Sequence, residues 1–91
     1  MIDESCTCSI LLIDDQPYAQ DFIAHCLEGC SDISLRYDSR AECAVEVARE
    51  VEATVVLVDL RMPGVDGFGV ITLLRANPAT EHLPVILLSS E

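Results

Sequence analysis

The sequence predicts an α/β fold, a doubly wound parallel sheet with strand order 2-1-3-4. Short apolar runs alternate along the chain with longer segments whose apolar residues recur at helical spacing. Strands that alternate with helices are joined by right-handed crossovers, so the strands should lie parallel with helices on both faces. The order of elements is β-α-β-α-β-α-β, without an internal repeat or linker.

Four apolar runs define the predicted strands. Three of them are continuous, for example "ILLI" and "VVLV", which is typical of parallel strands covered on both faces. The second strand alternates apolar and polar residues, as a half-exposed edge strand does. The predicted strands cover residues 9–13, 33–37, 54–59 and 84–89.

Three segments between the strands carry helix signals. Pro17 suits a first helical position, and Gly29 is a natural C-terminal stop. Ser39 and Glu42 have the spacing of a capping box before the second helix. The predicted helices cover residues 17–28, 41–51 and 67–76. The first helix should bury one apolar stripe, formed by Ala19, Phe22, Ile23, Cys26 and Leu27.

Size and composition restrict the class of protein. The chain has 91 residues, enough for one small domain. Its net charge of -11 argues against unaided binding to nucleic acid or to an anionic membrane. No leader opens the chain, and no apolar run approaches membrane-spanning length, so we expect a cytoplasmic protein. Five cysteines without a leader favour reduced thiols, and their spacing fits no usual zinc site.

Three aspartates follow two of the predicted strands. Asp14 and Asp15 end the first strand, and Asp59 ends the third. Ligands of doubly wound sheets bind beyond the carboxyl ends of the strands, so these carboxylates should converge if the two strands are neighbours. Such acids repel one another, and a hard divalent cation such as Mg²⁺ relieves that repulsion. The pattern predicts a site for Mg²⁺ and a phosphoryl group, and the alternative is acidic loop ends that face solvent.

Three blocks of the chain resemble the receiver domain of response regulators. They are "ILLIDDQP", "VVLVDLRMPGVDGFG" and "PVILLSS", in the family's order and over essentially the whole chain. The stretch "DLRMPGVDG" is the most specific of the motifs. The resemblance implies a flavodoxin-like fold and a cytoplasmic two-component phosphorelay function. A histidine kinase or phosphotransfer protein would pass a phosphoryl group to Asp59 and so switch a downstream output.

The resemblance also implies roles for other residues. Asp14, Asp15 and Asp59 would hold Mg²⁺, with the backbone carbonyl of Arg61 as a further ligand. The hydroxyl of Ser89 would contact the phosphoryl group and report its arrival, with Ser90 as the neighbouring alternative. The loop that presents the carbonyl would be shaped by Met62, Pro63, Gly64 and Gly67.

The chain departs from the family at its C-terminal end. A receiver normally has five strands and five helices, so we expect residues 1–91 to form a receiver that lacks the fourth helix, the fifth strand and the fifth helix. The family's phosphoryl-contacting lysine has no counterpart, since the chain contains no lysine. One such donor commonly contributes ~3 kcal/mol to a transition state. The strand at 84–89 would be an apolar sheet edge, which predicts either a fragment of a longer protein or a homodimer through that edge.

Other functions remain open at this stage. The segment "NPATEHLPVILLSSE" together with "DLRMPGVDG" is similar to receivers that precede GGDEF diguanylate cyclase domains, which suggests that output, although the chain is no conventional enzyme by itself. A phosphorylation-independent interaction or dimerisation module is one alternative. An aspartate-nucleophile phosphatase of the haloacid dehalogenase type is another. That class needs an Asp-x-Asp pair and usually a lysine, whereas this chain has Asp14-Asp15.

Overall fold

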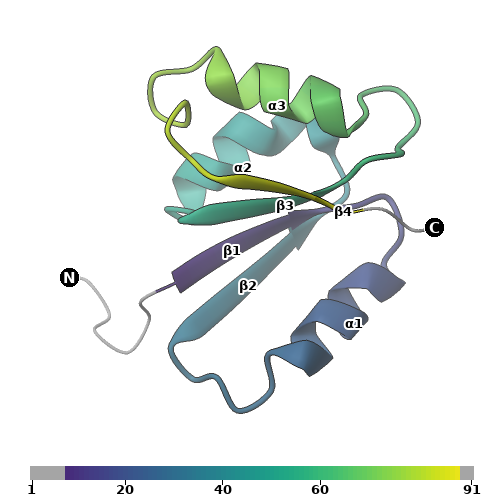
Figure 1. The fold of residues 1–91 in the computed structure, drawn as a ribbon, viewed down its shortest axis with the longest axis vertical. Coiled ribbons are helices and arrows are strands. Elements are labelled where there is room, and N and C mark those ends of the chain that lie inside the picture. The colour runs from purple at the N-terminus through teal and green to yellow at the C-terminus, as the bar shows by residue number, and fades with distance from the viewer. Residues whose placement is uncertain (1–7, 89–91) are drawn as a thin grey trace.

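The computed structural model describes residues 8–88 and folds them into a four-stranded parallel sheet with helices on both faces (Figure 1). The strand order is β2-β1-β3-β4, so the predicted fold class and strand order are confirmed. The elements are β1 (Cys8–Ile13), α1 (Tyr18–Cys26), β2 (Ile33–Asp38), the 3-10 helix η1 (Ala41–Cys43), α2 (Ala44–Glu50), β3 (Val55–Asp59), α3 (Gly67–Arg75) and β4 (Val85–Leu88).

The register of the sheet brings the carboxyl ends of its central strands level. β1 pairs with β3 from Ile10 opposite Val55 to Ile13 opposite Val58. The residues that follow these pairs therefore leave the sheet at the same edge. On the other side of β3, the pairing with β4 continues to Asp59 opposite Leu88.

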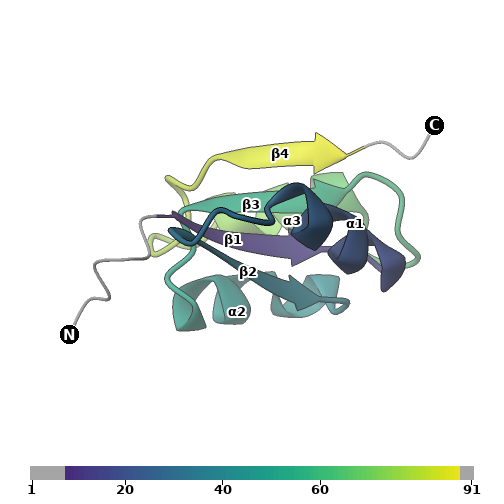
Figure 2. The same cartoon turned by 90° about the horizontal axis from the view of Figure 1, so that it is seen from below.

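Helices α2 and α3 close one face of the sheet (Figures 1 and 2). Alternate residues of β1 and β3 point into this layer, as the two-residue period of a strand requires. Thr80 lies buried beneath the end of α3, where its hydroxyl donates to the carbonyl oxygen of Leu74 at 2.7 Å. The core of this face contains Leu11, Ile13, Ala44, Val47, Ala48, Val56, Val58, Met62, Val70, Leu74 and Leu83.

Helix α1 covers the opposite face and covers it incompletely. None of its residues is buried, and Phe22 is 66% exposed. The predicted apolar stripe is therefore only partly correct: Ala19, Ile23 and Leu27 are half-buried, whereas Phe22 and Cys26 face solvent. The physical reason is that no second helix among residues 8–88 packs beside α1 on this face (Figure 1).

The capping box predicted at the second helix is wrong. No side chain caps η1 or α2, and α2 begins at Ala44 behind the 3-10 turn. Asp38 takes over the local hydrogen bonding, because its Oδ1 accepts from the backbone N–H of Arg40 at 2.8 Å. No helix within residues 8–88 combines the length and the apolar character that crossing a membrane requires.

Candidate functional site

Three carboxylates meet at the carboxyl ends of β1 and β3. Asp14 and Asp15 follow β1, and Asp59 is the last residue of β3. One carboxylate oxygen from each lies within 4.8 Å of the others. Asp14 and Asp59 are each only 8% exposed, and Asp15 is half-buried. The structure thus brings together the three acids that the strand order predicted to converge, and the solvent-facing alternative does not hold for Asp14 or Asp59.

The backbone after each strand fixes the direction of its carboxylate. Asp14 Oδ1 accepts from the N–H of Gln16 at 2.8 Å, and Asp59 Oδ1 accepts from the N–H of Arg61 at 3.2 Å. These are aspartate turns, in which the side chain hydrogen-bonds the backbone two residues on. Each acid therefore keeps one carboxylate oxygen engaged by its own loop.

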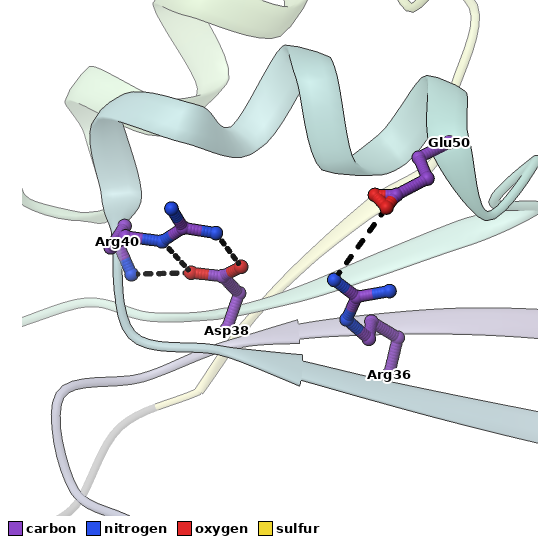
Figure 3. Close-up of polar contacts among 4 residues, drawn as sticks. All are labelled: Arg36, Asp38, Arg40 and Glu50. Atoms are coloured by element: carbon purple, nitrogen blue, oxygen red, sulfur yellow. Dashed lines mark hydrogen bonds and ion pairs between the residues drawn. The ribbon is translucent and has the colours of Figure 1, made fainter.

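A fourth strand-end aspartate, Asp38 at the end of β2, is neutralised instead. The Arg40 guanidinium donates from Nε to Asp38 Oδ1 at 3.0 Å and from Nη2 to Oδ2 at 2.9 Å (Figure 3). This contact, more than the burial that opposes it, holds the pKa of Asp38 below its ordinary value. On the same strand, Arg36 reaches Glu50 of α2 at 3.7 Å. Asp38 therefore closes the β2–η1 turn and is separate from the three-acid cluster.

The cluster differs from Asp38 in its electrostatics. Burial raises the pKa of Asp14, and the charges of Asp59 and Asp15 raise it further, while the N–H of Gln16 works in the opposite direction. A buried carboxylate whose neighbours are also carboxylates is costly to keep ionised. A bound cation would remove that cost.

A cavity of about 590 Å³ opens beside the cluster. Its polar end carries the three acids and Arg61. Its apolar wall includes Ala19, Phe22 and Ile23 of α1 and Leu88 of β4. The cavity therefore lies on the incompletely covered face of the sheet, where α1 is the nearest helix.

The donor set fits a hard divalent cation. Three carboxylates supply only oxygen ligands, which Mg²⁺ prefers over nitrogen or sulfur. Arg61 lies next to the cluster and lines the cavity. The role of its backbone carbonyl as a further ligand stays a prediction. Ser89 and Ser90 lie outside the described residues, and the role given to Ser89 is likewise a prediction.

The loop between β3 and α3 holds the end of β3 in place. Met62 is buried in the core, and Gly64 adopts φ +82°, a conformation that favours glycine. Pro63 is exposed at the turn. A Cβ on Gly67 would lie 2.9 Å from the carbonyl oxygen of Asp59, so a glycine is needed for α3 to begin this close to the strand.

Sequence reasoning missed the cap of α3. Asp66 Oδ1 accepts from the N–H of Gly69 at 2.9 Å, which fixes the first turn of the helix. The signal was present, because an aspartate directly before an apolar helical pattern is a common N-cap.

Comparisons with known proteins agree on one family. The family model described as "Response regulator receiver domain" matches residues 10–91. A "Probable cyclic di-GMP phosphodiesterase" of Vibrio cholerae is 34% identical over 85 residues, which cover 92% of this chain and 19% of the relative. "Response regulator Rre1" of Synechocystis is 29% identical over 82 residues, covering 90% of this chain and 36% of the relative. The chain thus spans only a minor part of either curated relative.

A solved structure gives the same result for the fold. The N-terminal domain of a response regulator receiver protein from Methanoculleus marisnigri JR1 aligns with a TM-score of 0.81 at 26% identity. The alignment covers 91% of this chain and 67% of that chain.

Proposed function

Because this chain belongs to the response regulator receiver domain family, we propose that it accepts a phosphoryl group on Asp59 with Mg²⁺. The donor would be a phosphohistidine of a histidine kinase or phosphotransfer protein, the class of partner with which receivers interact. The convergence of three carboxylates within 4.8 Å at two adjacent strand ends is the observation that supports this function. Carboxylates are seldom buried unless they are paired or bind a cation, and two of these three are buried.

Each residue of the site has a defined task in this reaction. A carboxylate oxygen of Asp59 forms a bond to phosphorus while the bond from phosphorus to the imidazole nitrogen breaks. The leaving nitrogen keeps the electron pair and is protonated. Asp14, Asp15, Asp59 and the carbonyl of Arg61 would hold Mg²⁺, which when bound neutralises negative charge on the carboxylates and phosphoryl oxygens.

The position of Asp59 suits a nucleophile. It ends the buried strand β3, its backbone touches the start of α3, and its Oδ1 is held by the N–H of Arg61. Positioning contributes much of the rate in phosphoryl transfer, since little other covalent chemistry is required of the protein. Ser89 would contact the transferred group after the reaction.

The extent of the domain and its output are part of the proposal. Residues 1–91 would correspond to the first four strands of a receiver, without the fourth helix, fifth strand and fifth helix. The solved relative, of which the chain spans 67%, supports this.

The output would belong to cyclic di-GMP signalling, with a diguanylate cyclase as the expected domain. The Vibrio cholerae relative is named a probable cyclic di-GMP phosphodiesterase, so its name refers to the same signalling molecule.

A second function is favoured by the β4 edge. Ile86 is 51% exposed and Leu87 is 36% exposed on a strand with no further neighbour among residues 8–88. A phosphorylation-independent module could use these exposed side chains and the free edge of β4 to form a homodimer.

The test is intact mass after incubation with Mg²⁺ and acetyl phosphate. The wild-type chain should gain the mass of one phosphoryl group, and Asp59→Asn should not. Asp66→Asn is the matched control, because Asp66 is exposed and outside the cluster and asparagine also caps helices well. A gain that persists in Asp59→Asn would refute the assignment of the nucleophile. No gain in a folded wild-type sample would favour the interaction module.

A further inference from the structure

Asp14 is tied by its backbone to the end of the neighbouring strand β2. Its N–H donates to the carbonyl oxygen of Asp38 at 3.3 Å, directly after the paired positions Ile13 and Asp38. Its carboxylate Oδ1 then accepts from the N–H of Gln16 at 2.8 Å. The main chain of Asp14 is therefore held on the β2 side by Asp38, and the direction of its side chain depends on that contact.

The strand end that carries Asp59 is supported from two sides. The next residue, Leu60, donates its N–H to the carbonyl oxygen of Leu88 at 3.0 Å and accepts from the N–H of Gly67 at 3.1 Å. Both β4 and the start of α3 thus hold it. Helix α1, which follows Asp14, has no buried residue. The contact with β2 is therefore the firmer support for the end of β1.

The side chain of Asp38 is itself held in one position by Arg40. Asp38 Oδ1 accepts from the backbone N–H of Arg40 at 2.8 Å and from Nε at 3.0 Å, and Oδ2 accepts from Nη2 at 2.9 Å (Figure 3). The preceding side chain does not share this task, since the enclosed hydroxyl of Tyr37 has no hydrogen-bond partner in the described part of the chain. The polar anchoring of this strand end therefore falls to Asp38 and Arg40.

A second arginine provides a contrast on the same strand. Arg36 reaches Glu50 through one contact at 3.7 Å, and both side chains are exposed to solvent (Figure 3). Exposed pairs of this kind contribute little to stability. The fork of Arg40 instead makes two parallel hydrogen bonds to a buried carboxylate, which gives the contact geometric specificity.

We propose that Asp38 and Arg40 are positioning residues for Asp14 in the Mg²⁺ site. The guanidinium of Arg40 fixes the carboxylate of Asp38 and closes the β2–η1 turn. That turn holds the Asp38 carbonyl oxygen, which holds the main chain of Asp14. Neither Asp38 nor Arg40 lines the cavity, so the two residues act through the backbone and not by contact with the ion. The inference rests on the proposed function, since it assigns them to the same site.

The first test is the Mg²⁺ affinity of Arg40→Ala, measured by NMR titration. Loss of a positive charge alone should strengthen the binding of a cation, whereas loss of positioning should weaken it. Loss of a direct partner of a metal ligand commonly costs about tenfold or more, and Arg40 acts one contact further away, so binding about threefold to tenfold weaker is expected. Arg36→Ala is the matched control, because it removes the same charge from β2 and should not weaken binding. Equal affinities in the two variants would overturn the proposal.

The second test measures the hydrogen bond itself, without Mg²⁺. Amide hydrogen exchange at the Asp14 N–H should be faster in Arg40→Ala, while Leu11 at the centre of β1 should exchange as in the wild type. Arg40→Lys keeps the charge and loses the planar fork, so its Asp14 N–H should exchange at an intermediate rate. Equal acceleration at Asp14 and Leu11 would show a general loss of stability and overturn the positioning role.

The two tests separate this inference from the proposed function. Wild-type Mg²⁺ affinity in Arg40→Ala would overturn only the role of Asp38 and Arg40. Failure of the folded wild type to bind Mg²⁺ would overturn both.

Discussion

The two faces of the sheet are built from the same strands and differ in how they are covered. On β3, Val56 and Val58 are fully buried beneath α2 and α3, while Val55 and Leu57 on the other face are only half-buried. The strand is equally apolar on both sides, so the difference comes from the helices and not from the strand. The carboxyl end of the sheet combines both conditions: the start of α3 packs against the backbone of Asp59 from the closed face, and the cavity opens on the other face.

The largest expected difference between the faces is in stability. Leu74→Ala removes a fully buried side chain of α3 and should lower the free energy of unfolding by about 2–5 kcal/mol. Leu27→Ala makes the same chemical change at the half-buried end of α1 and should cost about 1 kcal/mol. Urea unfolding followed by circular dichroism measures both. Equal losses would show that α1 contributes as much as α3, and the contrast between the faces would fail.

A second comparison lies within α3, between two glycines. Gly67→Ala would place a Cβ 2.9 Å from the carbonyl oxygen of Asp59 and 3.0 Å from Leu60 Cα, so backbone must move. We expect a loss of about 1–3 kcal/mol, as for overpacked cores, and less phosphorylation at Asp59. Gly69→Ala would place its Cβ 2.8 Å from Val65 Cγ1, which is a side chain and not backbone, and it gains helix propensity, so it should cost less than Gly67→Ala. A neutral Gly67→Ala would mean that the strand end is not held tightly.

Asp38 and Asp14, two of the three buried aspartates at strand ends, should respond to pH in opposite ways. The pKa of Asp38 is lowered on folding, so its ionised form stabilises the protein above the unfolded pKa, and this contribution is lost as pH falls through the folded pKa. Asp38→Asn should cost about 1 kcal/mol at pH 7, a modest figure because Arg40 is largely exposed, and nothing at low pH.

Asp14 has the opposite sign. Its pKa is raised on folding, so ionisation at neutral pH destabilises the native state, and acidification through the raised pKa relieves this. Asp14→Asn in metal-free buffer should therefore stabilise the protein at pH 7 by on the order of 0.5–1 kcal/mol, and the gain should shrink on acidification. Thermal melts across pH for both variants give the comparison. A loss of stability in Asp14→Asn at pH 7 would contradict the assigned electrostatics.

The smallest effect on stability is expected at the β4 edge. Ile86→Lys replaces an exposed side chain, so the free energy of unfolding should change by less than about 0.5 kcal/mol. Any self-association through β4 should nevertheless weaken, because a lysine on an edge strand opposes pairing with another strand. Analytical ultracentrifugation measures the association. Ser34→Lys on β2, the opposite edge, adds the same charge and should leave association unchanged.

The sequence could predict the features that depend on strand periodicity. Apolar runs that end in Asp14 and Asp59 were enough to place two carboxylates at one edge, because parallel strands share the direction of their carboxyl ends. Helical periodicity was less informative for α1, since it identifies Phe22 as part of a stripe without saying which element covers it. The hydrogen bonds of Asp38 and the enclosure of Tyr37 depend on turn geometry and on neighbouring strands, which no local pattern encodes.

The pairing of β1 directly with β3 has a consequence for folding kinetics. These strands are separated along the chain by α1, β2 and α2, so their contact is non-local and closes only after a long loop has been ordered. Asp14 and Asp59 therefore meet only in chains that have already made that contact, and their mutual repulsion is absent from earlier species. A cation that binds them should slow unfolding and leave the folding rate nearly unchanged.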